Sequence, residues 1–164
     1  MTIRRLTCGL LLGLFLAVPV SAESLSRGLN ADAPISISAE RLEADNTLRQ
    51  VNFIGNVVAR QGDVAIYAAR ILLVYPEKGR DIERIEAEGD VRIVQGSRVA
   101  TGQKASFFNR ERKIVLTGSP KVYQDDDFVE GDEITVLLDE ERSIVKSEQG
   151  SRVNAVFHPK GDKP

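Results

Sequence analysis

A repeat built on glycine, glutamine and a small residue constrains this chain more than any other feature. Three segments align without gaps on Gly55, Gly89 and Gly118. In each segment a glutamine follows the glycine at the same distance along the sequence. A small residue follows the glycine at a second, longer distance that is also the same in all three segments. These positions hold Gln61, Gln95 and Gln124, then Ala68, Gly102 and Gly131, and a partial earlier copy places Ala39 in the small-residue position. Internal repeats of this length predict supersecondary units stacked along one axis.

Within each repeat, apolar residues alternate with a period of two. Val57 and Ala59 share one face, whereas Val58 and Arg60 share the other. This alternation is typical of half-buried strands. Its parity changes after each small residue, which predicts a bulge or a corner there. We therefore expect an all-β fold of stacked antiparallel strands, with the repeat glycines starting strands and the glutamines ending them.

Polar segments between the predicted strands have the composition of turns. Asp125, Asp126 and Asp127 carry enough carboxylate for a calcium site, but a charge run at a hairpin tip is the better interpretation. The other predicted tips are Asp45-Asn46, Pro76–Gly79, Asn109–Arg112 and Asp139–Arg142.

The N-terminus has the pattern of a cleaved secretory signal peptide over residues 1–22. Arg4 and Arg5 precede an apolar run, and Val20-Ser21-Ala22 supplies a cleavage site. An uncleaved N-terminal anchor is the alternative. Because Cys8 lies in the run, the exported chain would have no cysteine and no disulfide. We divide the remainder into a flexible segment over residues 23–32, one domain over residues 33–157 and a disordered tail over residues 158–164.

Composition argues against nucleic acid and catalysis. The formal net charge is −2, and no basic cluster is present to meet phosphates. The one histidine, His158, stands in the predicted tail, where no catalytic triad can be assembled around it. No His or Cys cluster has metal-ligand spacing. We therefore expect no enzyme activity, no metal and no cofactor.

The inward face of the predicted strands is almost entirely aliphatic. Aromatic residues make up 5% of the chain and Trp is absent, so a wide interior is hard to fill to native density. Two interpretations follow: a filled core of a structural β-scaffold without ligand, or an interior that accepts a long apolar ligand. Each buried methylene of an acyl chain would contribute about 0.8 kcal/mol. The candidate lipid-binding residues are Ile35, Ile37, Val57, Ala59, Ile66, Ile71, Leu73, Val91, Ile93, Phe107, Val122, Ile134 and Val136.

The two ends of the predicted stack are open edges. Ala33–Ile37 and Arg152–Phe157 are the expected edge segments, and neither is heavily charged. Such edges favour pairing with another chain, and pairing of unlike edges gives head-to-tail filaments. The alternative is that Pro34 and the tail after Phe157 prevent this pairing.

Several of these segments together resemble the OstA-like (LptA) family of periplasmic lipopolysaccharide-transport bridge proteins. The resemblance covers residues 33–157 and is carried by the order and spacing of "PISISAERLEADNTLRQVNFIGNVVARQGDVAIYAARILL", "GQKASFFNRERKIVLTG" and "VEGDEITV". It implies a slightly twisted open β-jelly roll in the periplasm whose interior holds the acyl chains of lipopolysaccharide during outer-membrane biogenesis.

The same resemblance implies partners and contacts. Copies would associate head to tail, between an inner-membrane transporter-associated anchor protein and the N-terminal periplasmic domain of an outer-membrane translocon. The anchor protein shares the fold and is an alternative identity, but Val20-Ser21-Ala22 favours the soluble bridge. Lipid contacts of the family match Ile35, Ile37, Ile93 and Phe107, whereas Asn109 stands where an apolar residue is expected.

Overall fold

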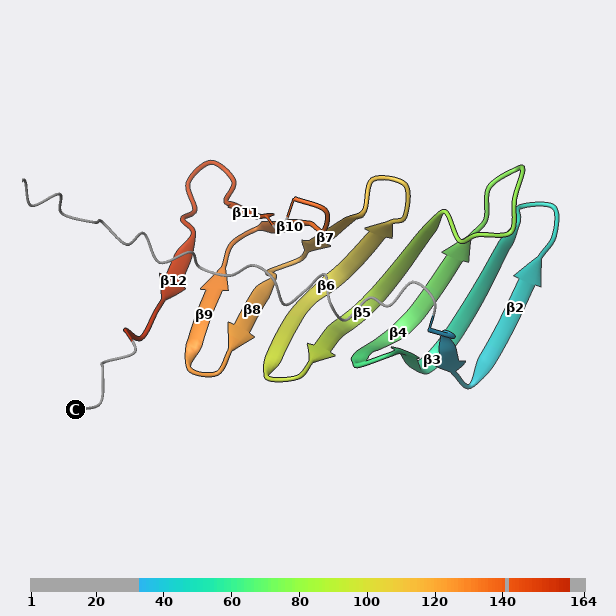
Figure 1. Cartoon of the computed structure of the whole chain (residues 1–164), viewed down its shortest axis with the longest axis horizontal. Helices are drawn as coiled ribbons and strands as arrows, with labels where there is room; N and C mark the ends of the chain where they lie inside the picture. Colours follow the sequence, from blue (N-terminus) through green and yellow to red (C-terminus); the bar gives the residue numbers. More distant parts are fainter. Residues whose placement is uncertain (1–32, 141, 160–164) are drawn as a thin grey trace, which may run out of the picture.

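The computed structural model describes residues 33–140 and 142–159, which form one open antiparallel sheet of twelve strands (Figure 1). Within these residues there is no helix that could cross a membrane. The predictions for residues 1–22 and 23–32, and for all of the tail 158–164 except its first two residues, lie outside the described residues. The strands are β1 (Ser36–Ser38), β2 (Arg41–Asp45), β3 (Gln50–Gln61), β4 (Val64–Val74), β5 (Arg84–Gln95), β6 (Arg98–Phe108), β7 (Lys113–Thr117), β8 (Lys121–Gln124), β9 (Asp127–Glu130), β10 (Glu133–Leu137), β11 (Arg142–Lys146) and β12 (Asn154–Val156).

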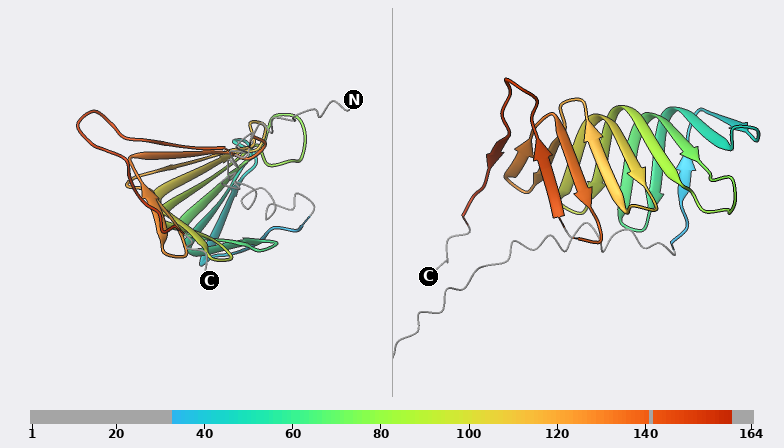
Figure 2. Two further views of the ribbon diagram at one scale, coloured as in Figure 1. Left: turned by 60° about the vertical axis from the view of Figure 1, so that its left-hand side comes forward. Right: turned by 90° about the horizontal axis from the view of Figure 1, so that it is seen from above.

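The sheet is folded into two halves because its four longest strands, β3 to β6, each continue across a bend. One half contains β2, β7, β10 and β11 with one part of each long strand. The other half contains β1, β8, β9 and β12 with the remaining parts. Figure 2 shows the halves meeting at an angle, so that their inner faces look toward one another. The expected stack of antiparallel strands in a β-jelly roll is confirmed.

The bend lies at the repeat glycines. The strand registers shift between Ile54 and Val57, between Tyr67 and Arg70, and between Glu88 and Val91, which confirms the predicted change of parity. Gly55, Gly89 and Gly118 all have φ between 76° and 86°, a region that favours glycine.

The expectation that the repeat glycines start strands is wrong for Gly55 and Gly89. Both lie inside continuous strands, β3 and β5, and Gly118 lies between β7 and β8. The reason is that a β-bulge adds one residue to the ladder and bends the strand without ending it. Pairing therefore resumes on the far side of each bulge.

The predicted strand ends agree with the structure. Gln61, Gln95 and Gln124 end β3, β5 and β8. Two-residue turns follow them, with Gly62, Gly96 and Asp125 at positive φ. The triple-aspartate segment therefore forms the predicted hairpin tip, and its last residue begins β9.

Aliphatic side chains from both halves form the core between them. Ile71, Leu116, Ile134, Val57 and Val91 are fully buried. Leu42 and Ala44 alternate along β2 in the way that predicts an inward face, but both are exposed, and Leu42 retains 56% of its accessible surface. The cause is position, because β2 lies at the edge of its half and pairs with β3 alone.

The outer face of the first half is polar. Lys104 Nζ lies 3.1 Å from Glu88 Oε1, and Arg70 Nη1 lies 3.4 Å from Glu88 Oε2. The hydrogen bond to Glu88 is the main cause that raises the pKa of Lys104. Exposed pairs of this kind add little stability, but they mark which face of the sheet meets solvent.

Candidate apolar binding site

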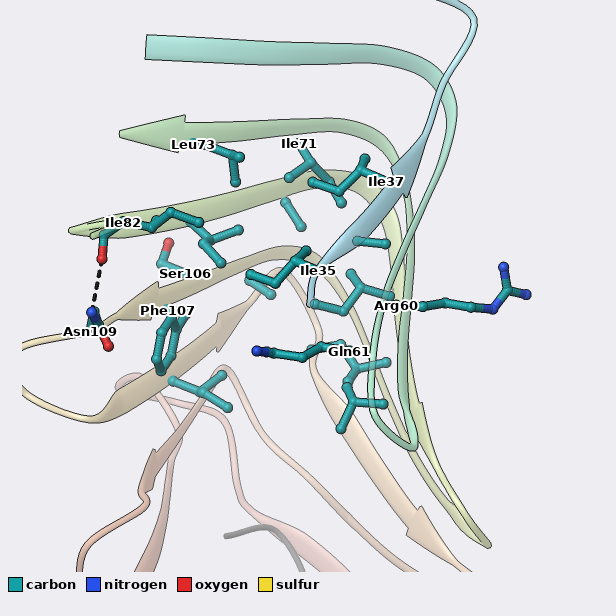
Figure 3. A pocket seen from close by; sticks show the side chains of 18 of the residues that line it. Ile35, Ile37, Arg60, Gln61, Ile71, Leu73, Ile82, Ser106, Phe107 and Asn109 are labelled. Atoms are coloured by element: carbon teal, nitrogen blue, oxygen red, sulfur yellow. Dashed lines mark hydrogen bonds between the residues drawn. The ribbon is translucent and has the colours of Figure 1, made fainter. Parts of the chain in front are cut away.

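A cavity of about 490 Å³ lies between the two halves of the sheet (Figure 3). Its volume falls in the range of small-molecule sites. Most of its lining is aliphatic and comes from β1, β3, β4, β5, β6 and β7. The lining residues are Ile35, Ile37, Ala59, Arg60, Gln61, Val64, Ile66, Ile71, Leu73, Arg80, Asp81, Ile82, Ile85, Ala87, Ile93, Ala105, Ser106, Phe107, Asn109, Arg112 and Ile114.

Eight of the thirteen candidate residues line this cavity. Ile35 lies just before β1 and the other seven come from β1, β3, β4, β5 and β6, so strand pairing brings together residues that are distant in sequence. Within the ladder, Ile37 is opposite Ala59, Ala59 is opposite Ile66, and Ile66 is opposite Ile93. The eight are Ile35, Ile37, Ala59, Ile66, Ile71, Leu73, Ile93 and Phe107.

The other five candidates lie outside the lining. Val57 and Val91 directly follow the bulges, at the bend where the two halves of the sheet meet. Each is 1% exposed. Ile134 and Val136 are buried on β10, and Val122 on β8 packs against the same core. The interior is therefore filled at the bend and toward the C-terminal strands, and it is open among the N-terminal strands.

Several lining residues are absent from the sequence-based set. Ile85 and Ile114 follow from alternation, because they share a face with Ala87 and Leu116. Ile82 has no such signal, since it lies in the segment between β4 and β5 rather than in a strand. Its place in the lining depends on how that segment folds.

The strand β1 and the residue before it, Ile35, supply the exposed rim of the cavity. Ile35 is 40% exposed and Ile37 is half-buried. The segment before β1 is fixed by Gln61, whose Nε2 donates to the Ala33 carbonyl oxygen at 3.0 Å. One repeat glutamine therefore helps to place both isoleucines over the opening.

Polar residues lie at the borders of the cavity. Arg60 and Gln61 come from the end of β3, whereas Arg80 and Asp81 come from the segment between β4 and β5. In Figure 3 the Arg60 side chain points away from the cavity. Apart from Ser106, Asn109 and Arg112, the rest of the lining is aliphatic or aromatic, which suits a hydrocarbon chain that carries a polar group at its end.

The lining residue Asn109 joins two segments at the cavity. Its Nδ2 donates to the Ile82 carbonyl oxygen at 2.9 Å, and its backbone N donates to the Glu83 carbonyl oxygen at 3.0 Å. The amide thus has a partner in the protein, which accounts for a polar side chain at a position where an apolar one was expected.

Comparison with known proteins gives one consistent result. A family model described as "LptA/(LptD N-terminal domain) LPS transport protein" matches residues 36–142. The chain is 29% identical over 138 residues to the "Lipopolysaccharide export system protein LptA" of Escherichia coli (strain K12), covering 79% of this chain and 74% of that protein. The protein of the same name from Haemophilus influenzae is 28% identical over 155 residues, covering 89% of this chain and 90% of that protein.

A solved structure shares the fold. The crystal structure of LptH from Pseudomonas aeruginosa, described as the LptA homologous periplasmic component of the lipopolysaccharide transport device, superposes with a TM-score of 0.67. The match covers 77% of this chain and 96% of that chain at 21% sequence identity.

Proposed function

Because the chain belongs to the LptA/(LptD N-terminal domain) LPS transport protein family, we propose that it binds lipopolysaccharide and carries it across the periplasm. The acyl chains occupy the apolar cavity and the sugar portion stays outside. The observation that carries this proposal is the open aliphatic space between the halves of the sheet. A scaffold with a filled interior would not leave such a space, because protein cores are close-packed.

The proposed mechanism is passive. Hydrophobic transfer holds each acyl chain, and no step at the site consumes energy or breaks a covalent bond. The lining lets a chain slide from one aliphatic contact to the next without losing a hydrogen bond. The driving force is supplied elsewhere in the pathway, and the proposal assigns no catalytic role to this protein.

The proposed partners bind at the two ends of the sheet. Within the described residues, β2 pairs with β3 alone, and β12 pairs with β9 alone. Leu42 and Leu48 are exposed at one end, and Val156 and Phe157 are exposed at the other. We assign these edges to another copy of the chain, to the inner-membrane anchor protein and to the N-terminal domain of the outer-membrane translocon. Their pairing would extend the apolar cavity from one subunit to the next.

A competition titration tests the proposal. Purified protein is saturated with a fluorescent probe that carries a hydrocarbon chain, and lipopolysaccharide is added. We expect displacement by the wild type and at least tenfold weaker binding by Ile93→Asp, because a carboxylate in the aliphatic lining must be desolvated. Val94→Asp on the opposite face of β5 is the matched control. Equal binding by both variants, or no displacement by lipopolysaccharide, would contradict the proposal.

A further inference from the structure

The segment between β4 and β5 forms one wall of the cavity. Arg80, Asp81 and Ile82 of this segment are lining residues, and Ile82 is half-buried against the core. Residues 77–81 are exposed. Figure 3 shows Ile82 on one side of the cavity, with Asn109 beside it and joined by a hydrogen bond. The apolar part of this wall, Ile82, therefore belongs to a loop that is mostly exposed to solvent.

The hydrogen bonds show how this segment is held. At its two ends, Tyr75 N donates to the Arg49 carbonyl oxygen and Glu83 N donates to the Val74 carbonyl oxygen, at 3.0 and 2.9 Å. Asn109 is bonded to the segment twice: its backbone N donates to the Glu83 carbonyl oxygen at 3.0 Å, and its side-chain Nδ2 donates to the Ile82 carbonyl oxygen at 2.9 Å. Only the second bond depends on the asparagine side chain. The side-chain amide binds a main-chain oxygen, so the interaction does not depend on the side chain of residue 82.

We propose that Asn109 is a positioning residue for lipid retention, which acts by fixing Ile82 against the bound acyl chain. The inference rests on the proposed function. An exposed loop with few backbone bonds opens at a low free-energy cost, and a single hydrogen bond shifts such an equilibrium by about threefold to tenfold. With Asn109 in place, Ile82 stays in the wall and the lipid dissociates slowly.

Dissociation kinetics in a mutant cycle test this role. The rate is measured by displacing a hydrocarbon-chain fluorescent probe with excess lipopolysaccharide. We expect Asn109→Ala and Ile82→Ala each to accelerate dissociation about threefold to tenfold. The double variant should match Ile82→Ala alone, because the Asn109 amide acts through the wall that this residue forms. Additive effects would overturn the inference.

Two further variants separate positioning from direct contact. Asn109→Leu keeps an apolar surface in the cavity but removes the hydrogen bond, so we expect the same acceleration as with Asn109→Ala. Slower dissociation from Asn109→Leu would mean that residue 109 acts as a lipid contact, and would overturn the inference. Asn52→Ala is the matched control, since it removes an amide that accepts from Arg70 Nε at 2.7 Å on the outer face. It should leave the rate unchanged.

Hydrogen exchange of the lipid-free protein tests whether the hydrogen bond from Asn109 to the Ile82 carbonyl oxygen holds the segment in place. We expect Asn109→Ala and Asn109→Leu to raise exchange in residues 76–83 without changing exchange in β3 or β5. Unchanged exchange there would overturn the inference even if lipid binding is normal. If the wild type binds neither probe nor lipopolysaccharide, the retention role and the proposed function both fail, whatever the exchange shows.

Discussion

Gly89 and Ala69 face each other across the bend with no room for a second methyl group. A Cβ built on Gly89 would lie 2.7 Å from the Ala69 Cβ. The same is true two strand pairs further along the sheet, where a Cβ on Gly118, just after β7, would lie 2.5 Å from the Gln103 Cβ on β6. The bulge that folds the sheet into two halves therefore brings neighbouring strands too close for any residue but glycine.

Gly89→Ala is expected to destabilise the protein by about 3 kcal/mol, since it adds a steric clash to the strain of a left-handed φ. Gly96→Ala is the control, because Gly96 also has a positive φ but a Cβ there would meet nothing within 4 Å. That variant should lose only about 1 kcal/mol. Urea unfolding measures both, and equal losses would show that crowding at the bend has no energetic weight.

Alanine substitutions of core residues should lower stability, whereas those of cavity residues should mainly weaken lipid binding. Ile134 is 1% exposed and lies outside the cavity lining, so Ile134→Ala should cost about 3 kcal/mol of unfolding free energy and leave lipid affinity unchanged. Ile93 is half-buried and lines the cavity, so Ile93→Ala should weaken lipid binding severalfold and cost about 1 kcal/mol or less. Parallel unfolding and binding titrations would reveal whether the two sets are in fact distinct.

Acid should loosen the connection between β11 and β12 through Asp132. The Oδ2 atom of Asp132 accepts hydrogen bonds from Ser151 Oγ and, at 2.7 Å, from the backbone N of Glu148. These bonds hold the pKa of Asp132 below its ordinary value of 3.8, and the bond from Ser151 has the larger effect. A lowered folded pKa means that the stabilisation is present above pH 3.8 and is lost as the pH falls through the folded value.

We therefore expect the protection of residues 147–151 against hydrogen exchange, measured relative to the intrinsic exchange rate at each pH, to fall in the wild type as the pH drops below 3.8. In Asp132→Asn, this protection should already be lower at neutral pH and should change less on acidification. A variant whose acid response matches the wild type would exclude Asp132 as the titrating group.

The exposed C-terminal edge should control self-association. Val156→Lys places a charge on β12, where it opposes pairing with another strand. We expect this variant to remain monomeric at concentrations at which the wild type forms oligomers in sedimentation velocity. Gln103→Lys adds the same charge to β6, which has neighbours on both sides, and it should associate like the wild type. Loss of association in both variants would point to net charge rather than to the edge.

The repeat made most of the fold predictable. Alternation around Val57 and Ala59 gives the inward face, and the parity change after Ala68 gives the bend, because both depend on local backbone geometry. The placement of Gly55 and Gly89 inside strands was not predictable in this way. A bulge and a strand start have the same glycine signal, and the choice between them is made by pairing with neighbouring strands.

The site was predictable only in part for a different reason. Alternation identifies which residues face inward but not how far the two halves are separated at each strand. Ile134 and Ile93 have the same pattern, yet one is buried in packed core and the other lines the cavity. Ile82 and Asn109 meet through a loop conformation that no periodicity encodes.

Site-specific photo-crosslinking to lipopolysaccharide tests the central claim most directly. A photoreactive residue is placed at Ile37 or Phe107 in the cavity, and at Val58 or Tyr67 on the outer face, where Arg92 lies over the Tyr67 ring. We predict crosslinks from Ile37 and Phe107 and none from Val58 and Tyr67. Equal labelling at all four positions, or labelling at none, would contradict the claim that acyl chains occupy the space between the two halves of the sheet.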